Sequence, residues 1–557
     1  MTESAMQSER RKDNLAPLTS ENLWDLVVVG GGITGAGVAR EAARAGLKVL
    51  LVERQDFAWG TSSRSSKMVH GGLRYIAQGD VRTTMHSVHE RERLMREAPG
   101  LVDLMPYVMP HYAGKFPGRW LFGGLLRVYD WLAGQRYRQY HSADAVIQRF
   151  PLLRRQRLTG ATEFADAVTD DSRLVQRVLQ EACDDGATAI NYLGVTSIKQ
   201  DSHGVSLTLQ DALTSDHHVI RAQAVVNATG VWVNDLRQQL GKTHSVRPAR
   251  GSHIVVEAER LPTDVSFTVL HPKDKRPIFV YPWEGRTVIG TTDLDHPAPG
   301  NDEVGITYDE LHYLLDLVRY QFPQAEISER DVISSWAGVR PLVASGADNS
   351  SKESRDHTVW QDGRVVSVSG GKLTTFRRIA HDVLSKLRED NSDDDTPPAF
   401  PELTLSNGPV FTASASVSEG WADVLSTLPE KRQRRLLGFY GRCAKDILAQ
   451  SSEETREVVP GTDVLWAELV WSAANEQVVH LDDLLLRRTR VGLLVPQGGL
   501  THESTLKSLL QSPLGWSDAQ WQEEVRRYRI LWETFYWLPS ERAEVLAGHT
   551  AEVQQAS

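Results

Sequence analysis

Apolar and small residues near the start of the chain follow the order strand, helix, strand. Residues 24–29 form a short apolar run typical of a buried strand, and residues 33–46 place small side chains at helical spacing. Residues 48–53 form a second buried run that ends in an acid. Two buried runs joined by a helix predict a βαβ unit with parallel strands.

Later apolar runs predict two further strands of this sheet and an insertion between them. Residues 224–230 end in a tight turn of small residues, and residues 365–375 lead through glycines into a helix. Between these runs, residues 252–293 alternate apolar and polar positions with turn signals, as antiparallel strands do. The parallel-sheet domain is therefore predicted to be discontinuous in sequence.

The two ends of the chain carry different patterns. Residues 1–22 are polar and lack an apolar core, which predicts a disordered extension. Residues 388–401 are acidic and contain prolines, as linkers do. Beyond them Leu, Trp, Glu and Arg recur at helical spacing, so residues 402–557 are predicted to form a helical C-terminal domain.

Composition narrows the class of protein. The 557 residues are 41% hydrophobic and 24% charged, as in ordinary globular proteins, and the net charge of −10 gives no basic field for nucleic acid. The sequence contains no uninterrupted run of about 18 apolar residues, so it predicts no transmembrane helix. The two cysteines, Cys183 and Cys443, are far apart, which fits a reducing, cytoplasmic compartment and predicts no bound metal.

A dinucleotide fingerprint lies between the first strand and the first helix. Gly30, Gly32 and Gly35 fit G-x-G-x-x-G, which allows a tight turn, close approach of a pyrophosphate and close packing of helix on strand. Glu53, at the end of the second strand, can accept hydrogen bonds from ribose hydroxyls. With one fingerprint in the chain, we expect one bound dinucleotide.

These patterns together predict an α/β fold with three parts. A discontinuous Rossmann-like domain spans residues 23–387, an antiparallel-sheet substrate domain is inserted into it, and the helical domain follows the linker. The predicted limits are mainly 23–85, 160–245 and 330–387 for the nucleotide-binding part and mainly 86–159 and 246–329 for the inserted part.

A run of hydroxyl and basic residues, 61–75, follows the fingerprint closely. Its first half, which includes Thr61, Ser62, Ser66 and Lys67, is expected to line the cofactor. Its second half, from His70 to Tyr75, is expected to face an anionic substrate, because two glycines after the histidine allow close approach to the backbone.

The chain resembles the flavin-linked glycerol-3-phosphate dehydrogenases, within the glycine-oxidase-like group of FAD oxidoreductases. The resemblance rests on segments spread over residues 24–385: VVVGGGITGAGVA, TSSRSSKMVHGGLRY, RGSHIVV, YPWEGRTVIGTTD, AGVRPL and SGGKLTTF. It implies noncovalent FAD, oxidation of sn-glycerol 3-phosphate to dihydroxyacetone phosphate, and electron delivery to a membrane quinone at the inner membrane surface. The cofactor residues predicted in all are Gly30, Gly32, Gly35, Glu53, Thr61, Ser62, Ser66, Lys67, Gly230, Gly371 and Thr374.

A phosphorylated alcohol needs cations for its phosphate and a base for its hydroxyl. Arg74 and Arg340 are the candidates for the phosphate, with the hydroxyl of Tyr75 as a further donor. His70 suits the base because its ordinary pKa is close to physiological pH. Lys372 is the rival, as base, as electrophile or as a charge beside the reduced flavin, and the sequence leaves the choice open.

Residues 115–157 carry nine Lys or Arg against two acids. Within them Leu121, Phe122, Leu125, Val128, Tyr129 and Leu132 are predicted to share one helical face, with Arg127 and Asp130 opposite. Such a helix can lie in a membrane interface or pack on the core as an ordinary surface helix.

The sequence leaves three other functions open. They are an oxidase that passes electrons to oxygen, an amine-oxidising relative, and a flavin-fold binding module without turnover. The sequence also leaves open whether the chain forms a homodimer.

Overall fold

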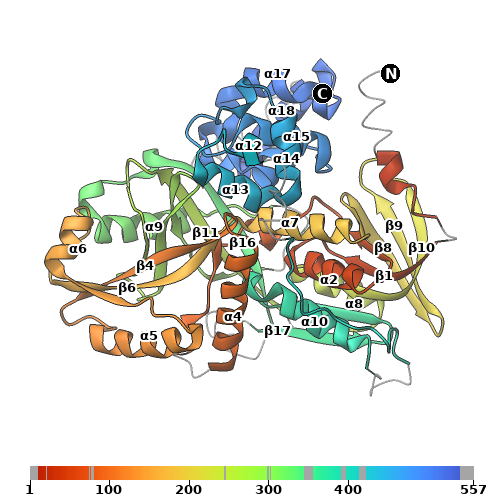
Figure 1. Ribbon diagram of the computed structural model, residues 1–557, viewed down its shortest axis with the longest axis horizontal. Helices are drawn as coiled ribbons and strands as arrows, with labels where there is room; N and C mark the ends of the chain where they lie inside the picture. The colour runs from red at the N-terminus through yellow and green to blue at the C-terminus, as the bar shows by residue number, and fades with distance from the viewer. Residues whose placement is uncertain are drawn as a thin grey trace.

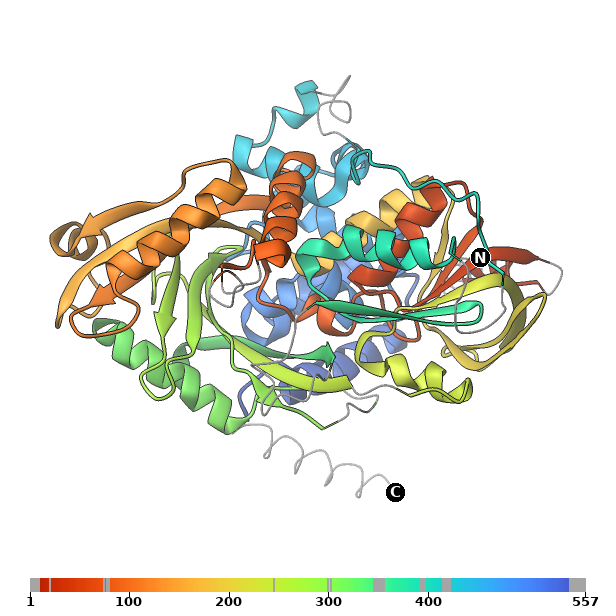
Figure 2. The same ribbon diagram turned by 90° about the horizontal axis from the view of Figure 1, so that it is seen from below.

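The computed structural model describes residues 11–19, 22–73, 76, 81–243, 246–297, 300, 303–343, 356–389, 397–412 and 422–539. Two sheets lie side by side in it, and the C-terminal helices cover the junction between them in both views (Figures 1 and 2). The α/β class, the antiparallel second sheet and the helical C-terminal region predicted from the sequence are confirmed.

The predicted βαβ unit forms the centre of the first sheet. Strand β1 pairs in parallel with β2 on one side and with β10 on the other, and β10 pairs in parallel with β18. Eight strands form this sheet in the described part of the chain: β1 (Leu23–Val29), β2 (Val49–Val52), β7 (Thr188–Ile190), β8 (Leu193–Asp201), β9 (Gly204–Asp211), β10 (His217–Asn227), β17 (His357–Asp362) and β18 (Val365–Gly370).

Helix α2 (Ile33–Arg44) packs on this sheet between α7 (Asp171–Asp184) and α10 (Phe376–Lys386). Its small residues allow the close packing, because Ala36, Ala39 and Ala42 are buried, and a Cβ on Gly37 would lie 2.9 Å from the Phe376 ring. α8 (Val233–Gln239) follows β10. The small side chains thus bring the start of α2 against the ends of the parallel strands.

The second sheet is mainly antiparallel and contains ten strands among the described residues. Its longest pairings join β11 to β16 and β4 to β6. Its strands are β3 (Met68–Val69), β4 (Val102–Tyr112), β5 (Gln139–Ser142), β6 (Leu158–Thr169), β11 (Val246–Glu257), β12 (Ser266–Leu270), β13 (Pro277–Trp283), β14 (Arg286–Gly290), β15 (Leu294–Asp295) and β16 (Val332–Val343). Helices α4 (Val81–Glu97), α5 (Arg119–Ala133), α6 (Ala143–Arg149) and α9 (Tyr308–Gln321) accompany it.

Three segments predicted for the nucleotide-binding part lie in the second sheet instead, and the first of them is β3, which pairs with β6. Strand β6, at residues 158–169, pairs along its length with β4, and β16, at residues 332–343, pairs with β11. The predicted limits at residues 160 and 330 therefore need correction. Strand patterning shows which residues form strands, but partner choice depends on which distant strand presents a matching apolar face.

The N-terminal segment also differs from the prediction of a disordered extension. Residues 11–15 are helical, and the guanidinium of Arg11 donates to the carbonyl of Asn191 at 2.8 Å and to Asp211 at 3.1 Å. Leu18 is buried in the core of the first sheet. Residues 1–10, 20 and 21 lie outside the described residues, as do residues 390–396 of the predicted linker.

The C-terminal domain is helical and shares its apolar clusters with the two sheets. Its helices are α12 (Ala422–Leu425), α13 (Glu430–Tyr440), α14 (Ala444–Ala449), α15 (Trp466–Asn475), α16 (Val491–Leu494), α17 (Glu503–Leu514) and α18 (Asp518–Phe535). Leu469, Trp521 and Trp532 are buried in one cluster with Val255 and Trp336 of the second sheet. The C-terminal domain is therefore packed directly against the second sheet.

Candidate active site

The turn between β1 and α2 requires glycine at two of the predicted positions. Gly30 has φ +112°, and a Cβ there would lie 2.6 Å from the carbonyl oxygen of Ala228. A Cβ on Gly35 would overlap the carbonyl oxygen of Gly30. The fingerprint glycines thus let the first turn of α2 approach two strand ends, which leaves the helix N-terminus facing the cavity beside it.

Glu53 stands at the end of β2, as predicted. One carboxylate oxygen accepts the amide of Gly31 at 2.7 Å, and the other accepts that of Gln55 at 2.9 Å. Burial raises the pKa of Glu53 above its ordinary value, although both hydrogen bonds oppose the shift. The carboxylate therefore braces the fingerprint turn at the wall of the cavity.

A cavity of about 250 Å³ lies over this turn and is called the cofactor cavity here. Its walls combine the glycine turn, the acid at the end of β2 and hydroxyl side chains, which is the donor and acceptor set that a dinucleotide needs. The residues present therefore fit FAD. The predicted residues that line this cavity are Gly30, Gly32, Glu53, Thr61, Ser62, Gly230, Gly371 and Lys372.

The hydroxyl run of residues 61–67 divides between the cavity and the protein interior. Thr61 donates to the carbonyl of Val339 at 2.5 Å, and Ser62 accepts the amide of Ile33 at 3.0 Å, so both are held at the cavity wall. Ser66 instead meets Nε2 of His253 at 2.9 Å, and Lys67 is fully buried with its ammonium 2.8 Å from Asp171. Ser66 and Lys67 lie behind the wall.

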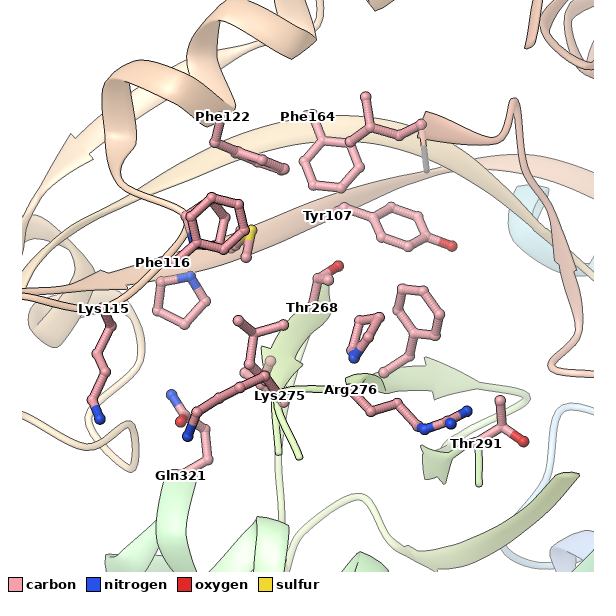
Figure 3. Close-up of a pocket in the computed structure, with 18 of the residues that line it drawn as sticks. Tyr107, Lys115, Phe116, Phe122, Phe164, Thr268, Lys275, Arg276, Thr291 and Gln321 are labelled. Atoms are coloured by element: carbon pink, nitrogen blue, oxygen red, sulfur yellow. The ribbon is translucent and has the colours of Figure 1, made fainter. Parts of the chain in front are cut away.

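A second, larger cavity of about 1010 Å³ is lined by His70 and Arg340 and is called the substrate cavity here. The guanidinium of Arg340 lies 3.1 Å from the Thr291 hydroxyl and 3.4 Å from Asp293. Arg276, which the sequence did not single out, pairs with the same Asp293 at 2.7 Å. Figure 3 shows Arg276 and Thr291 on one side and the rings of Tyr107, Phe122 and Phe164 on the other.

Buried polar groups fix the segment that carries His70. The amide of Gly71 donates to Asp166 at 2.9 Å and to the Tyr129 hydroxyl at 3.1 Å, and Arg91 pairs with the same carboxylate at 2.6 Å. A Cβ on Gly71 would overlap that tyrosine hydroxyl, which explains the first glycine of the pair. Asp166, Tyr129 and Arg91 are scattered along the chain, so no local motif marked them.

The two candidate bases line different cavities. Lys372 lines the cofactor cavity, and its ammonium donates to the Ser87 hydroxyl of α4 at 3.0 Å. His70 lines the substrate cavity with Arg340. The Thr374 hydroxyl contacts the carbonyl of His70 at 3.4 Å, which joins the two segments. Gly370 and Gly371 before Lys372 have φ +82° and +84°, so this turn requires glycine.

Of the other predicted site residues, the structure describes Gly230 but not Arg74 and Tyr75. Gly230 opens the short helix after β10 with φ +61°, and its carbonyl accepts the Ser369 hydroxyl at 3.3 Å.

His253 is a buried residue that the sequence reasoning quoted but did not assign. Its ring stacks on Trp336 at 4.8 Å between centroids, and burial together with the charges of Arg340 and Lys67 holds its pKa well below the ordinary value. A neutral imidazole is thus placed behind the arginine of the substrate cavity.

Helix α5 exists where the basic amphipathic segment predicted one, but its faces differ. Phe122, Tyr129 and Leu132 point inward, and Asp130, predicted on the polar face, is buried with them. Other apolar residues of the helix are exposed instead, namely Trp120, Leu121, Val128 and Trp131, and so is Phe116 before the helix. The predicted single face was wrong because the helix has apolar residues on a buried side and on an exposed side. The helix lies at the edge of the molecule away from the C-terminal helices (Figure 1).

Comparison with known proteins agrees with this geometry. The family model for FAD-dependent oxidoreductases matches residues 25–371, and the model for the C-terminal domain of alpha-glycerophosphate oxidase matches residues 371–521. An aerobic glycerol-3-phosphate dehydrogenase of Staphylococcus aureus (strain MRSA252) is 31% identical over 555 residues, covering 95% of this chain and 97% of the relative.

Two solved structures show how far the fold is shared. The glycerol-3-phosphate dehydrogenase from Bacillus halodurans complexed with FAD has a TM-score of 0.72 at 26% identity, covering 95% of this chain and 98% of that one. The L-alpha-glycerophosphate oxidase from Mycoplasma pneumoniae has a TM-score of 0.55 at 17% identity, covering 70% and 99%, and shows the fold alone.

The chain therefore belongs to the family of FAD-dependent oxidoreductases, and FAD is its cofactor. Within that family, it matches the aerobic glycerol-3-phosphate dehydrogenases over nearly its whole length. The resemblance inferred from the sequence is thereby confirmed.

Proposed function

We propose that this protein oxidises sn-glycerol 3-phosphate to dihydroxyacetone phosphate and passes the electrons to a membrane quinone. The observation that carries the proposal is the substrate cavity, in which Arg340 and Arg276 both pair with Asp293 and which His70 also lines. The relatives matched over nearly the full chain carry the name of that activity.

The arginine pair suits a phosphate dianion. Arg340 lies on β16 and Arg276 just before β13, and both guanidinium groups are half-buried. Asp293 pairs with both arginines and Asp274 lies 3.8 Å from Arg276. The cavity lining still carries more positive than negative side chains, because Lys115, Arg154 and Lys275 line it as well and Asp166 is the remaining acid. A guanidinium binds phosphate oxygens through a planar pair of donors and stays charged at any physiological pH.

His70 is the proposed base for the C2 hydroxyl. It shares the substrate cavity with Arg340, whereas Lys372 lines the cofactor cavity. FAD, when bound, supplies the two-electron oxidation. The hydrogen bonds from Gly71 to Asp166 and Tyr129 hold the backbone beside His70, which limits the positions that its imidazole can take.

The test of substrate and acceptor uses one sample. The purified holoenzyme is mixed with glycerol 3-phosphate without oxygen, and loss of flavin absorbance is followed. Bleaching supports the substrate, and glycine or proline as control should leave the flavin oxidised. Reoxidation by a soluble quinone faster than by air supports the quinone, whereas stoichiometric hydrogen peroxide in air would favour an oxidase.

We also propose that the exposed apolar face of α5 attaches the protein peripherally to the cytoplasmic membrane. Trp120 and Trp131 are 78% and 77% exposed, and Arg119 and Arg127 are exposed on the same helix. Exposed aromatic residues beside arginines suit an anionic lipid interface. Among the described residues, no helix is long and apolar enough to span a bilayer.

Vesicle binding tests this attachment. Trp120→Ser with Trp131→Ser should lower the partition coefficient onto phosphatidylglycerol vesicles, measured by sedimentation, by about thirtyfold or more, since each buried indole contributes on the order of 1–2 kcal/mol. Val219→Ser, which removes another exposed apolar side chain, on β10, is the matched control. Equal sedimentation of the double variant and the control would contradict the assignment.

A further inference from the structure

Arg490 of the C-terminal domain lies under the loop that carries the hydroxyl residues of the cofactor cavity. It immediately precedes α16, its backbone has φ +64°, and its side chain is buried. A residue with a side chain seldom adopts that backbone conformation, so the surroundings of Arg490 must hold it there.

The guanidinium joins three segments that are far apart in sequence. Nε donates to both carboxylate oxygens of Asp170, at 2.9 and 3.2 Å, and Nη1 donates to the carbonyl of Leu486 at 2.6 Å. Nη2 donates to the carbonyl of Ser63 at 3.2 Å and also pairs with Asp171. The C-terminal domain, the start of α7 and the hydroxyl loop therefore share one side chain.

Lys67 completes the arrangement from the loop itself. Its ammonium donates to the carbonyl of Ser63 at 2.7 Å and to Asp171 at 2.8 Å, and Asp171 also accepts the amide of Ser65 at 2.8 Å. Two cations and two carboxylates thus balance inside the protein. Removing one cation leaves a buried carboxylate without its partner, which is costly in a low-dielectric interior.

The loop held in this way forms part of the cofactor cavity wall. Thr61, Ser62 and Ser65 line that cavity, and Ser63 lies between them with its carbonyl turned to Arg490 and Lys67. Ser62 also accepts the amide of Ile33 at the start of α2. A shift of Ser63 would therefore move the hydroxyl groups on both sides of it.

We propose that Arg490 is a positioning residue through which the C-terminal domain fixes the hydroxyl loop of the FAD site. This gives the helical domain a role in cofactor binding although it contributes no side chain to the cofactor cavity in the part of the chain that the structure describes. An arginine suits the position because one planar group with five donors serves Asp170, Asp171, Leu486 and Ser63 together.

Substitution of Arg490 tests the proposal. Arg490→Met should raise the FAD dissociation constant at least tenfold and shift the flavin reduction potential, because the loop loses its fixed position. Arg490→Lys should restore part of the affinity. The readouts are release of FAD from the holoenzyme, followed by flavin fluorescence, and a spectroscopic redox titration.

Arg435→Met is the matched control. Arg435 is also a buried arginine of the C-terminal domain, but its ion-pair partners are Glu468 at 2.8 Å and Glu284 at 2.9 Å, which lie outside residues 61–67. Both methionine variants should lower the melting temperature of the apoprotein, but only Arg490→Met should change FAD affinity and potential.

Equal FAD affinity and potential in the two variants would overturn the proposal, because Arg490 would then contribute to stability alone. If Arg490→Met does not fold, the same comparison between Arg490→Lys and Arg435→Lys decides. In that comparison, unchanged FAD release from Arg490→Lys would overturn the proposal, and faster release than from Arg435→Lys would support it.

Discussion

The cofactor cavity and the substrate cavity are formed by different kinds of residues. The cofactor cavity is formed largely by backbone and short side chains, and Gly30, Gly32 and Glu53 come from one βαβ unit. The polar part of the substrate cavity contains charged side chains from separate segments, among them Arg340, Arg276 and Asp293. Local geometry shapes the first, and sheet pairing shapes the second.

This difference predicts that damage to each cavity has its own signature. The cofactor cavity, which is formed largely by backbone, is sensitive to steric change, because a single added methyl group that faces a carbonyl oxygen cannot be accommodated. A set of charged side chains fails electrostatically, because removing one guanidinium leaves the fold and the other cavity in place. Variants that separate FAD binding from substrate turnover would therefore test the distinction.

The largest effect is expected from Gly35→Ala. Its Cβ would overlap the carbonyl oxygen of Gly30, so α2 would have to move away from β1 and the cofactor cavity would open. We expect FAD to be absent from the purified protein and turnover to be undetectable. The ratio of absorbance at roughly 450 nm to that at roughly 280 nm measures the bound flavin. Gly46→Ala is the control for replacing a nearby glycine, because a Cβ there meets no atom within 4 Å.

Gly46 itself has φ +88°, so its alanine variant is expected to lose some stability while keeping FAD. Full flavin content in Gly35→Ala would contradict the steric account of the cofactor cavity.

Arg340→Ala should have the next largest effect. Loss of one charged hydrogen-bonding group costs roughly 1.5–3 kcal/mol, which corresponds to about a 10- to 150-fold fall in kcat/KM for glycerol 3-phosphate. FAD content should stay at the wild-type level, because Arg340 lines the substrate cavity. Arg330→Ala, an exposed arginine just before β16, is the control, and loss of FAD from Arg340→Ala would show that the two cavities are not independent.

The smallest effect is expected on stability, from a histidine beside the turn of Gly370 and Gly371. His357 lies beside Gly371 and pairs with Asp356 at 3.1 Å and with Asp382 of α10 at 3.0 Å, and these carboxylates raise the pKa of His357 to about 9 despite its burial. A pKa raised above the unfolded value of about 6.5 means that the folded state binds the proton more tightly. This stabilisation is complete below pH 6.5 and is lost as the pH rises through 9.

His357→Gln should therefore lower the free energy of unfolding by on the order of 2 kcal/mol at pH 6 and by much less at pH 10. Thermal unfolding at both values measures the difference, and His203→Gln, an exposed histidine, is the control. An equal loss of stability at both pH values would show that the ion pairs of His357 do not account for its contribution.

Much of the fold could be predicted because its signals are local. The run at residues 24–53 contains strand, glycine turn, helix and acid in order, and the structure reproduces each of them. The predicted domain limits placed β6 and β16 in the wrong part, since each strand pairs with another strand that lies roughly 40 residues or more away along the chain. Helix α5 was located correctly, but its faces were not, because only packing decides which of two apolar sides is buried.

The sequence by itself determined that a dinucleotide binds, because the fingerprint glycines occupy fixed positions along the chain, and its resemblance to known proteins gave the family and FAD. Only the tertiary structure placed Arg276 and Asp293 beside Arg340, separated His70 from Lys372, and brought Arg490 under the cofactor loop. Those relations join residues tens to hundreds of positions apart. They depend on strand register and on side chains buried together, which no local pattern specifies.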